Sequence, residues 1–379
     1  MTDLEFLYVL LAAFYLWECL CWIRRGGVAF TRGWGRSSRV APTVGNQRGG
    51  FALGCPLPPM GSLAVGTQLP LSLSAEAVLA YVATSVSPAG RPIQTGRFLR
   101  WADLKTIAAR GKSVHANGEL LVPAQSTTHA RWLADQLRSL GKLAPGKRGE
   151  SIAQLISSFD TNAIKTRWSD FEPRVRPIRR LANALLLFVF VMAPAVVWRL
   201  GIELAWPWLV GTLFALTGVI TFLFRRAYRV LYPDATDERF SQCLMVLLFS
   251  PAAMRAHDLL SRPLLEQVHP VAVAATLCDG ADFRRFARQI LLDLQHPALP
   301  LATEGKPEHA AIEAAARAQT LAAVELTVRS AGATPAELTR PPLPLDPTCR
   351  AFCPRCHAQF TSPDLRCTDC GGLPVRAFG

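Results

Sequence analysis

Three long apolar blocks constrain the fold of this chain more than any other feature. Half of the 379 residues are hydrophobic and only 18% are charged, and the apolar residues are concentrated in Leu4–Ile23, Leu181–Trp198 and Leu204–Phe224. A bilayer core about 30 Å thick requires about 20 helical residues, so each block is long enough to span it. The sequence therefore predicts an α-helical integral membrane protein with three transmembrane helices, at 1–23, 181–198 and 204–224.

Each block has an alternative interpretation. A cleaved signal peptide is the alternative for the first block, but its amino-terminal flank is acidic at Asp3 rather than basic. Helices buried in a soluble core are the alternative for the other two blocks. Trp198, Trp206 and Trp208 cluster around the turn between these blocks, where aromatic residues of a membrane interface are expected. We therefore expect 181–224 to form a helical hairpin through the membrane.

Basic residues beside the blocks predict the orientation of the protein. They follow the first block, precede the second and follow the third, whereas the turn between the last two blocks contains one Arg and one Glu. The basic flanks are Arg24, Arg25, Arg32, Arg36, Arg39, Arg174, Arg176, Arg179, Arg180, Arg225, Arg226 and Arg229. Cytoplasmic flanks carry an excess of Lys and Arg. We therefore expect a multi-pass protein of the inner (plasma) membrane, with its amino terminus outside and both long hydrophilic segments in the cytoplasm.

The segment between the first two blocks carries almost all of the basic excess. Residues 24–180 contain 23 Lys and Arg against 8 Asp and Glu, a net charge of +15, whereas residues 225–379 contain 17 against 16. Each Lys or Arg near an anionic leaflet contributes about 1 kcal/mol to membrane binding, so the lipid bilayer and its anionic headgroups are the expected partners. Nucleic acid is the alternative partner, because Phe30, Trp34 and Trp101 lie among the arginines and could stack on bases.

Residues 24–180 are expected to form a basic cytoplasmic α+β domain. The Gly- and Pro-rich stretch 24–70 indicates short strands or extended chain, and Ser74 is a candidate N-cap for a helix of about ten residues. Residues 97–101 alternate as in a strand. Asn117-Gly118 stands between two β-prone runs and predicts a hairpin turn, because both residues tolerate positive φ.

A helix is predicted after this hairpin. Residues 126–141 have apolar side chains at three-to-four-residue spacing, with Ser or Thr at the start and Gly at the end. Strands and a hairpin followed by one amphipathic helix resemble the second half of a pleckstrin-homology-like domain over 71–140, which implies a β-barrel corner capped by a helix. A second helix is predicted at 150–159. Pro173 and Pro177 predict that no helix runs directly into the second apolar block.

The segment after the third block is predicted to be a helical cytoplasmic domain, 225–333. Ser250 before a proline indicates a helix start there. The apolar run 243–254 is too short to span a bilayer, so we expect it to pack in a core or to lie at the membrane interface. Residues 334–350 contain five prolines, which is typical of an extended linker. The expected helices are 235–248, 251–260, 263–277, 282–294 and 308–330.

The end of the chain carries the strongest chemical signal. Cys353 and Cys356 are separated by two residues, as are Cys367 and Cys370, with ten residues between the pairs. A Cys-x-x-Cys turn brings two sulfurs together, and two such turns supply the four thiolates that Zn²⁺ binds in a tetrahedron. In a reducing cytoplasm, clustered thiols favour metal binding over disulfides. We therefore predict a structural Zn²⁺ site formed by these four cysteines.

These cysteines, with Phe352 and Phe360 beside them, resemble the zinc-ribbon (rubredoxin-like) class of modules over 351–379. The resemblance implies a closed site in which the ion is structural, because catalytic zinc keeps an open position; iron or a redox dithiol is the alternative. The sequence departs from the commonest form where His357 replaces a Gly and Thr368 replaces a Pro. Cys349 and His357 are the other residues that could act as ligands.

No catalytic constellation accompanies the cysteines in the sequence. His257-Asp258 and Cys278-Asp279 are neighbouring candidate groups, but no histidine pair has the spacing of a metalloprotease. The whole chain resembles a bacterial membrane protein, and we expect a scaffold or regulatory function in which the ribbon and the Pro-rich linker bind protein partners. The alternatives are a membrane protein that associates with nucleic acid through 24–180 or the ribbon, and an enzyme at the membrane face whose reaction the sequence does not identify.

Overall fold

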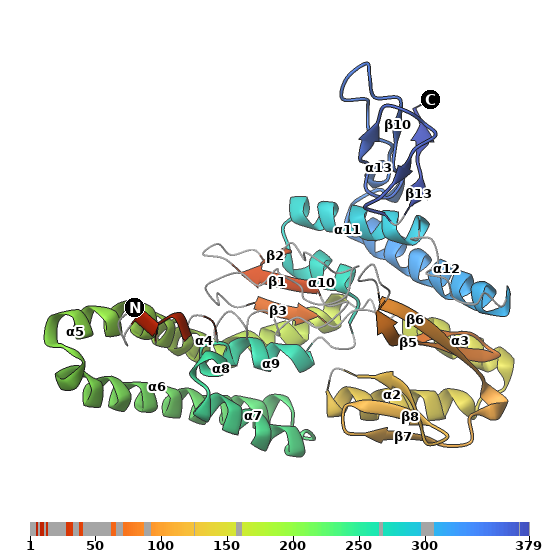
Figure 1. Ribbon diagram of the computed structural model, residues 1–379. Coiled ribbons are helices and arrows are strands. Elements are labelled where there is room, and N and C mark those ends of the chain that lie inside the picture. The colour runs from red at the N-terminus through yellow and green to blue at the C-terminus, as the bar shows by residue number, and fades with distance from the viewer. Residues whose placement is uncertain are drawn as a thin grey trace.

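The structure is a computed structural model of the chain. Most of the described residues are helical, and the strands form small sheets (Figure 1). The first predicted transmembrane helix, 1–23, falls almost entirely outside the described residues and stays a prediction. The structure describes residues 5–6, 8–10, 13, 28–32, 38–40, 62–65, 71–86, 92–124, 126–156, 161–264, 268–296, 307–370 and 372–378.

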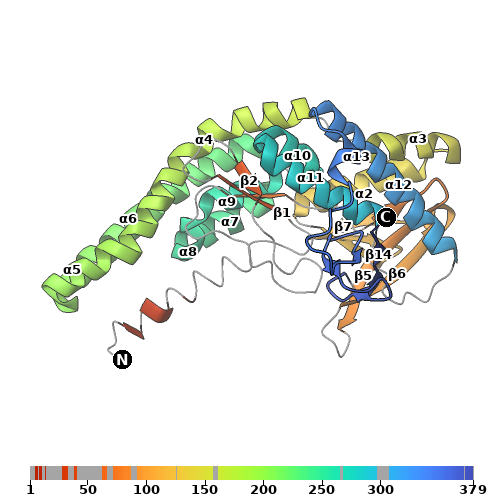
Figure 2. The ribbon, with the colours of Figure 1, turned by 90° about the horizontal axis from the view of Figure 1, so that it is seen from above.

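Two long helices lie side by side, and their paired ends extend away from the rest of the molecule (Figures 1 and 2). The first runs through 40 residues and consists of α4 (Thr161–Leu187), a π-helical segment η2 (Phe188–Met192) and α5 (Ala193–Leu200). The second is α6 (Ile202–Leu231). Gly201 between them has a φ of 74°, a left-handed conformation that favours Gly. Both helices are long and apolar enough to cross a membrane, and they form the hairpin predicted at 181–224.

Pro173 and Pro177 do not interrupt α4, so the predicted break is wrong. Both prolines are exposed, whereas Phe171, Val175 and Ile178 on the other side of the helix are fully buried. A proline removes one helical hydrogen bond, but on an exposed face water can satisfy the freed carbonyl group. Burial of the apolar side therefore keeps the helix continuous from Thr161 into the apolar segment.

Short strands occur in the Gly- and Pro-rich stretch 24–70, as predicted. β1 (Val28–Arg32) pairs antiparallel with β2 (Ser38–Val40) and with β3 (Ser62–Val65), so the three strands form one small sheet.

Two further three-stranded sheets lie within residues 71–123. The first contains β4 (Leu71–Leu73), β5 (Ala77–Val86) and β6 (Pro92–Arg100), and the second contains β7 (Ile107–Arg110), β8 (Ser113–Ala116) and β9 (Glu119–Pro123). A 3-10 turn, η1 (Trp101–Asp103), connects the two sheets. The helix predicted after Ser74 is therefore wrong, because these residues form β5. Its Val and Thr residues favour a strand, and pairing with β4 and β6 satisfies its backbone on both sides.

The predicted hairpin and the helix that follows it are both confirmed. Asn117 and Gly118 connect β8 to β9 with φ values of 53° and 85°, as a two-residue turn with positive φ requires. α2 (Thr127–Gly141) begins at Ser126, whose hydroxyl oxygen accepts a hydrogen bond from the His129 N–H at 2.9 Å. The second predicted helix is also present, as α3 (Pro145–Ile156).

The remaining helices pack with α4 and α6 around a large apolar core. The predicted helix 251–260 is divided at Arg255, and Ser250 does not cap it, because the N-cap residue is Phe249. Within the apolar run 243–254, Val246 and Met254 are buried in the core, whereas Leu244, Leu247 and Leu248 are exposed. The helices are α7 (Thr236–Leu248), α8 (Ser250–Met254), α9 (Ala256–Leu264), α10 (Pro270–Leu277), α11 (Gly280–Gln295), α12 (Pro307–Ser330) and α13 (Pro335–Leu338).

A carboxylate joins the β-containing region to the helical region. Glu238 of α7 accepts hydrogen bonds from the backbone N–H of Thr127 at 2.5 Å and from its hydroxyl at 2.6 Å. Thr127 is the first residue of α2, so the Glu238 carboxylate also lies at the positive end of the α2 dipole. This contact fixes the amino-terminal end of α7 against α2.

His129 is expected to make the folded state sensitive to mild acid. Burial lowers the pKa of His129 to about 4, whereas an unfolded chain has a histidine pKa of about 6.5. The unfolded state therefore binds more protons between these values, so stability is complete above about pH 6.5 and is lost as the pH falls toward 4, by at most about 1.4 kcal/mol per pH unit for one proton. Thermal unfolding from pH 7.5 to 5 should show a weaker pH dependence in His129→Leu, and an unchanged pH dependence would contradict this role.

Candidate metal centre

The carboxyl-terminal module consists of five two-residue strands. β10 (Ala351–Phe352), β11 (Gln359–Phe360) and β14 (Arg376–Ala377) form one sheet, and β12 (Arg366–Cys367) pairs with β13 (Leu373–Pro374). Each hairpin carries one Cys-x-x-Cys turn, so the two turns face each other across the module. This arrangement is compatible with a zinc-ribbon-like module.

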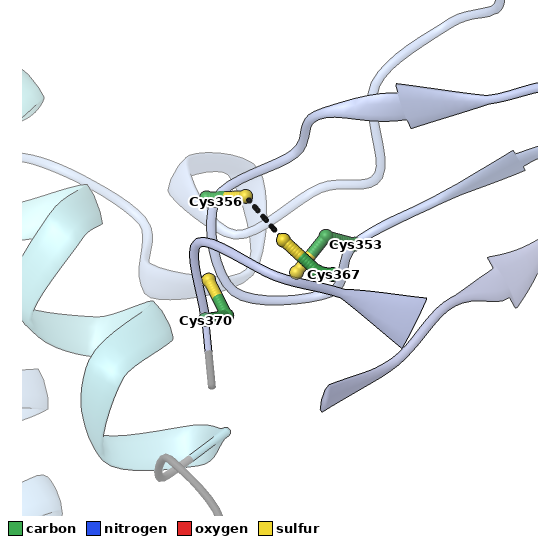
Figure 3. A group of neighbouring side chains, drawn as sticks. All are labelled: Cys353, Cys356, Cys367 and Cys370. Atoms are coloured by element: carbon green, nitrogen blue, oxygen red, sulfur yellow. Dashed lines mark hydrogen bonds between the residues drawn. The ribbon is translucent and has the colours of Figure 1, made fainter. Parts of the chain in front are cut away.

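The four predicted cysteines lie together (Figure 3). The Sγ atoms of Cys353, Cys356, Cys367 and Cys370 are all within 4.8 Å of one another, and those of Cys356 and Cys367 are 3.6 Å apart. A disulfide would require about 2.05 Å, whereas two sulfurs of a tetrahedral zinc site with Zn–S bonds of about 2.3 Å lie about 3.8 Å apart. The residues therefore fit a four-thiolate metal site.

Backbone geometry brings each pair of thiols together. In the first turn, His357 has a φ of 60° and its N–H donates to the Cys353 carbonyl at 2.9 Å. In the second, Gly372 has a φ of 89° and its N–H donates to the Cys367 carbonyl at 2.9 Å. Left-handed backbone normally favours Gly, which is the residue that the zinc-ribbon resemblance leads one to expect at the position of His357. The substitution leaves the turn intact.

The electrostatics of the cluster favour a cation. Burial raises the pKa of Cys353, but hydrogen bonds from the N–H groups of Cys356 and Arg355 and with the thiols of Cys356 and Cys370 together lower this pKa overall. Burial raises the pKa of Cys356 to about 11, and burial together with the neighbouring thiols raises the pKa of Cys370. Four thiols in this space cannot all ionise unless a positive ion balances them, and a coordinated metal deprotonates its thiol ligands. The donor set therefore suits a bound divalent cation.

The turn that contains Cys353 and Cys356 packs against helix α11. The Nε of Arg355 donates to Oδ1 of Asp293 at 2.6 Å, and Arg288 donates to Nδ1 of His357. Arg355 is buried although it lies within the Cys353-to-Cys356 turn. The turn that supplies two thiols thus also supplies the side chains that hold the ribbon against the helical region, and sequence reasoning did not predict this contact.

The Pro-rich linker is also fixed to the ribbon rather than fully extended. It contains α13, which packs against α11 and α12. Gln359 of β11 donates to the Leu343 carbonyl at 2.8 Å and accepts from the Leu345 N–H at 2.8 Å. The segment expected to be an extended linker thus contains one helical turn, and the Gln359 side chain bonds two backbone groups of its later part.

The two other candidate ligands, Cys349 and His357, lie outside the cluster. Cys349 is a half-buried free thiol that does not belong to the group of four. His357 lies next to Cys356 in sequence, but its ring contacts Arg288 and packs edge-on against Phe352. Among the described residues, these four cysteines alone form a group of metal-ligand type.

The pair His257-Asp258 belongs to a buried ionic cluster. Asp258 Oδ2 accepts from Arg255 Nε at 3.0 Å, and both side chains are almost completely inaccessible to solvent. Nδ1 of His257 lies 3.5 Å from Asp258 Oδ1, and its ring meets Phe171 of α4 edge-on. The hydroxyl of Ser261 donates to the Asp258 backbone carbonyl at 2.8 Å. Since no substrate could reach these groups, the cluster is structural.

The pair Cys278-Asp279 has a structural arrangement as well. Asp279 caps α11 by accepting a hydrogen bond from the Asp282 N–H at 2.8 Å. Burial, with the nearby charges of Asp282 and Asp279, raises the pKa of Cys278 to about 12. A thiol is nucleophilic only as its thiolate, so this cysteine is unreactive near neutral pH.

A cleft of about 430 Å³ lies between α2 and α3. Its lining consists of apolar and neutral polar side chains, so it contains no group for acid–base catalysis. The lining residues are Trp132, Gln136, Ser139, Leu140, Leu143, Ser151, Gln154 and Leu155.

Comparisons of the chain with protein-family models, with curated proteins and with solved structures each gave no match. The pleckstrin-homology-like resemblance of 71–140 therefore rests on the order of its strands and helix. The features of the described residues that bear on function are the cysteine cluster, the long apolar helices and the surfaces beside them.

Proposed function

We propose that this chain is a membrane-anchored scaffold or regulatory protein that uses a structural zinc ribbon to hold a partner-binding surface. The observation that carries the proposal is the closed set of four cysteines, whose first turn is docked on α11 through Arg355 and Asp293. All four protein ligands are supplied, which is typical of structural rather than catalytic zinc. In this proposal the ion folds the ribbon and the ribbon positions the linker.

The choice of Zn²⁺ rests on the chemistry of the ligands. Four thiolates select Zn²⁺ or iron among the common metals, and a ribbon with short strands and two Cys-x-x-Cys turns is a typical structural zinc module. Cys353, Cys367 and Cys370 are buried while Cys356 is exposed, so one edge of the site faces solvent. Metal entry through that edge requires little rearrangement.

Membrane anchoring is supported by the exposed apolar surface of the long helices. Trp198, Trp208, Phe214 and Phe222 are exposed along the α5–α6 hairpin, and soluble proteins rarely expose an apolar patch of this extent. In this proposal, the hairpin and the first apolar block cross the inner membrane, the amino terminus lies outside, and the basic residues of 24–180 contact anionic headgroups.

The partner-binding surface that we propose is the linker beside the ribbon. Leu343 and Leu345 are 85% and 82% exposed, within the sequence Pro341-Pro-Leu-Pro-Leu345. Gln359 holds this segment by two hydrogen bonds, so less conformational entropy is lost on binding. Exposed, preordered Pro-rich segments bind aromatic-lined grooves of partner proteins.

Replacing Leu343 and Leu345 with Asp is expected to abolish partner capture while leaving the metal bound. Both side chains are exposed, so the change should cost little stability, whereas two desolvated carboxylates in an apolar groove are strongly unfavourable. The measurement is cross-linked capture from detergent-solubilised membranes, with metal analysis of the same samples. Leu365→Asp is the matched control, because Leu365 is an exposed leucine of the ribbon outside the linker. Equal capture by all three proteins would argue against the linker as the binding surface.

A further inference from the structure

Helix α7 presents an exposed apolar face. Phe240, Leu244, Leu247 and Leu248 are exposed, with exposed fractions of 74% for Phe240 and 70% for Leu248. They recur at the four- and three-residue spacing that places side chains on one face of a helix. Val246, on the other side of α7, is fully buried in the core. The helix therefore packs on the protein by one face and presents large apolar side chains on the other.

The two ends of α7 differ in polarity. At its amino-terminal end, Glu238 bonds Thr127 of α2, and the exposed residues include the polar Thr236 and Ser241 together with the apolar Phe240. At its carboxyl-terminal end the exposed residues Leu247 and Leu248 are apolar. The exposed polar side chains of α7 thus lie in its amino-terminal half, near the contact with Thr127, and its carboxyl-terminal half exposes leucines.

The position of α7 against α6 relates this gradient to the long apolar helices. The short turn 232–235 reverses the chain, and α7 runs back along the end of α6 (Figure 1). Burial raises the pKa of the Cys243 thiol and the charge of Arg225 acts in the opposite direction, so Cys243 lies near the level of Arg225. Leu247 follows one turn later, about 5.4 Å further along, toward the level at which Phe222 of α6 is exposed.

We propose that α7 lies in the interfacial layer of the membrane, with its carboxyl-terminal half among the acyl chains and its amino-terminal end in the headgroup region. This inference rests on the proposed insertion of α6. A lipid surface is the occupant that fits, because the exposed apolar side chains of α7 belong to a helix that packs along the end of α6, which itself exposes Phe222. The exposed residues Arg225, Arg226 and Arg229 form the cationic band expected at the headgroups beside it.

The test uses the full chain reconstituted in vesicles of phosphatidylcholine and phosphatidylglycerol. A fluorescent non-canonical amino acid is introduced at Leu248, at Ser241 as the control on the polar half of α7, or at Phe214 as the control within α6. All three side chains are exposed, so the probe should not disturb the core. Quenching by lipids with doxyl groups on their acyl chains is compared with quenching by acrylamide in water.

The expected result is strong lipid quenching with loss of acrylamide quenching at positions 248 and 214, and the reverse at position 241. Acrylamide quenching at 248 combined with lipid quenching at 214 would overturn the inference and leave the anchoring of α6 intact. Protection of 248 from both quenchers would also overturn it, since a protein surface such as a second copy would then cover α7. Absence of lipid quenching at 214 would instead refute the proposed insertion itself.

Discussion

Replacing Cys370 with Ser is expected to abolish stoichiometric metal binding and to unfold the ribbon, and Cys353→Ser should have the same effect. Structural zinc contributes about 10–16 kcal/mol in zinc-finger peptides at neutral pH, more than five two-residue strands supply by packing. Elemental analysis should show metal loss in both variants. Limited proteolysis should then cleave within 351–378, because the docked turn containing Arg355 would lose its shape and its contact with Asp293.

Cys349→Ser is the matched control for these variants. Cys349 is a nearby half-buried thiol outside the four-cysteine group, so its replacement should preserve both the metal and the resistance to protease. If Cys353→Ser and Cys370→Ser both contained as much metal as the wild type, the proposed metal site would be refuted. Loss of the metal in Cys353→Ser and Cys370→Ser, together with its retention in Cys349→Ser, would identify the clustered cysteines as the ligands.

Replacing Asp258 with Ala is expected to destabilise the helical region by about 3–5 kcal/mol, the usual cost of leaving a buried charge without its partner. Arg255 is fully buried and its Nε donates to Asp258, so the variant would remove the carboxylate that pairs with this buried guanidinium. Thermal unfolding in detergent, followed by circular dichroism at a helix-sensitive wavelength, measures the loss. The effect should be large because α4, α8 and α9 meet around this cluster.

Two comparisons isolate the cause of that loss. Asp135→Ala removes the exposed partner of Arg138 and should cost no more than about 1 kcal/mol. The double variant Arg255→Met with Asp258→Leu removes both charges and should recover much of the stability lost in Asp258→Ala. A loss in Asp258→Ala no greater than in Asp135→Ala would contradict the assignment of a buried ion pair.

The features that could be predicted from the sequence depend on short stretches of chain. Two Cys-x-x-Cys turns bring thiols together over a few residues, and Asn117-Gly118 forms its turn through its own backbone preferences. The hairpin at 181–224 follows from composition and length in the same way. In each case the physical cause lies within the residues that show the pattern.

The features that could not be predicted depend on tertiary contacts. β5 forms a strand because β4 and β6 pair with it, although its Ala-rich sequence is compatible with a helix. α4 passes through Pro173 because its other face is buried. Arg355 and Asp293 are 62 positions apart, and no local pattern indicates that they meet. Arg255 and Asp258 do have the spacing of a helical ion pair, but only the packing of α4 shows that the pair is buried.

Metal analysis of the full chain purified from carbonate-washed membranes tests the central claim most directly, because it examines the anchor and the ribbon in one sample. Carbonate removes peripheral proteins but leaves helices that cross the bilayer. The account predicts that the chain remains in the washed membranes and contains one zinc ion per molecule. Recovery of the chain in the wash, or a washed chain without metal, would contradict it.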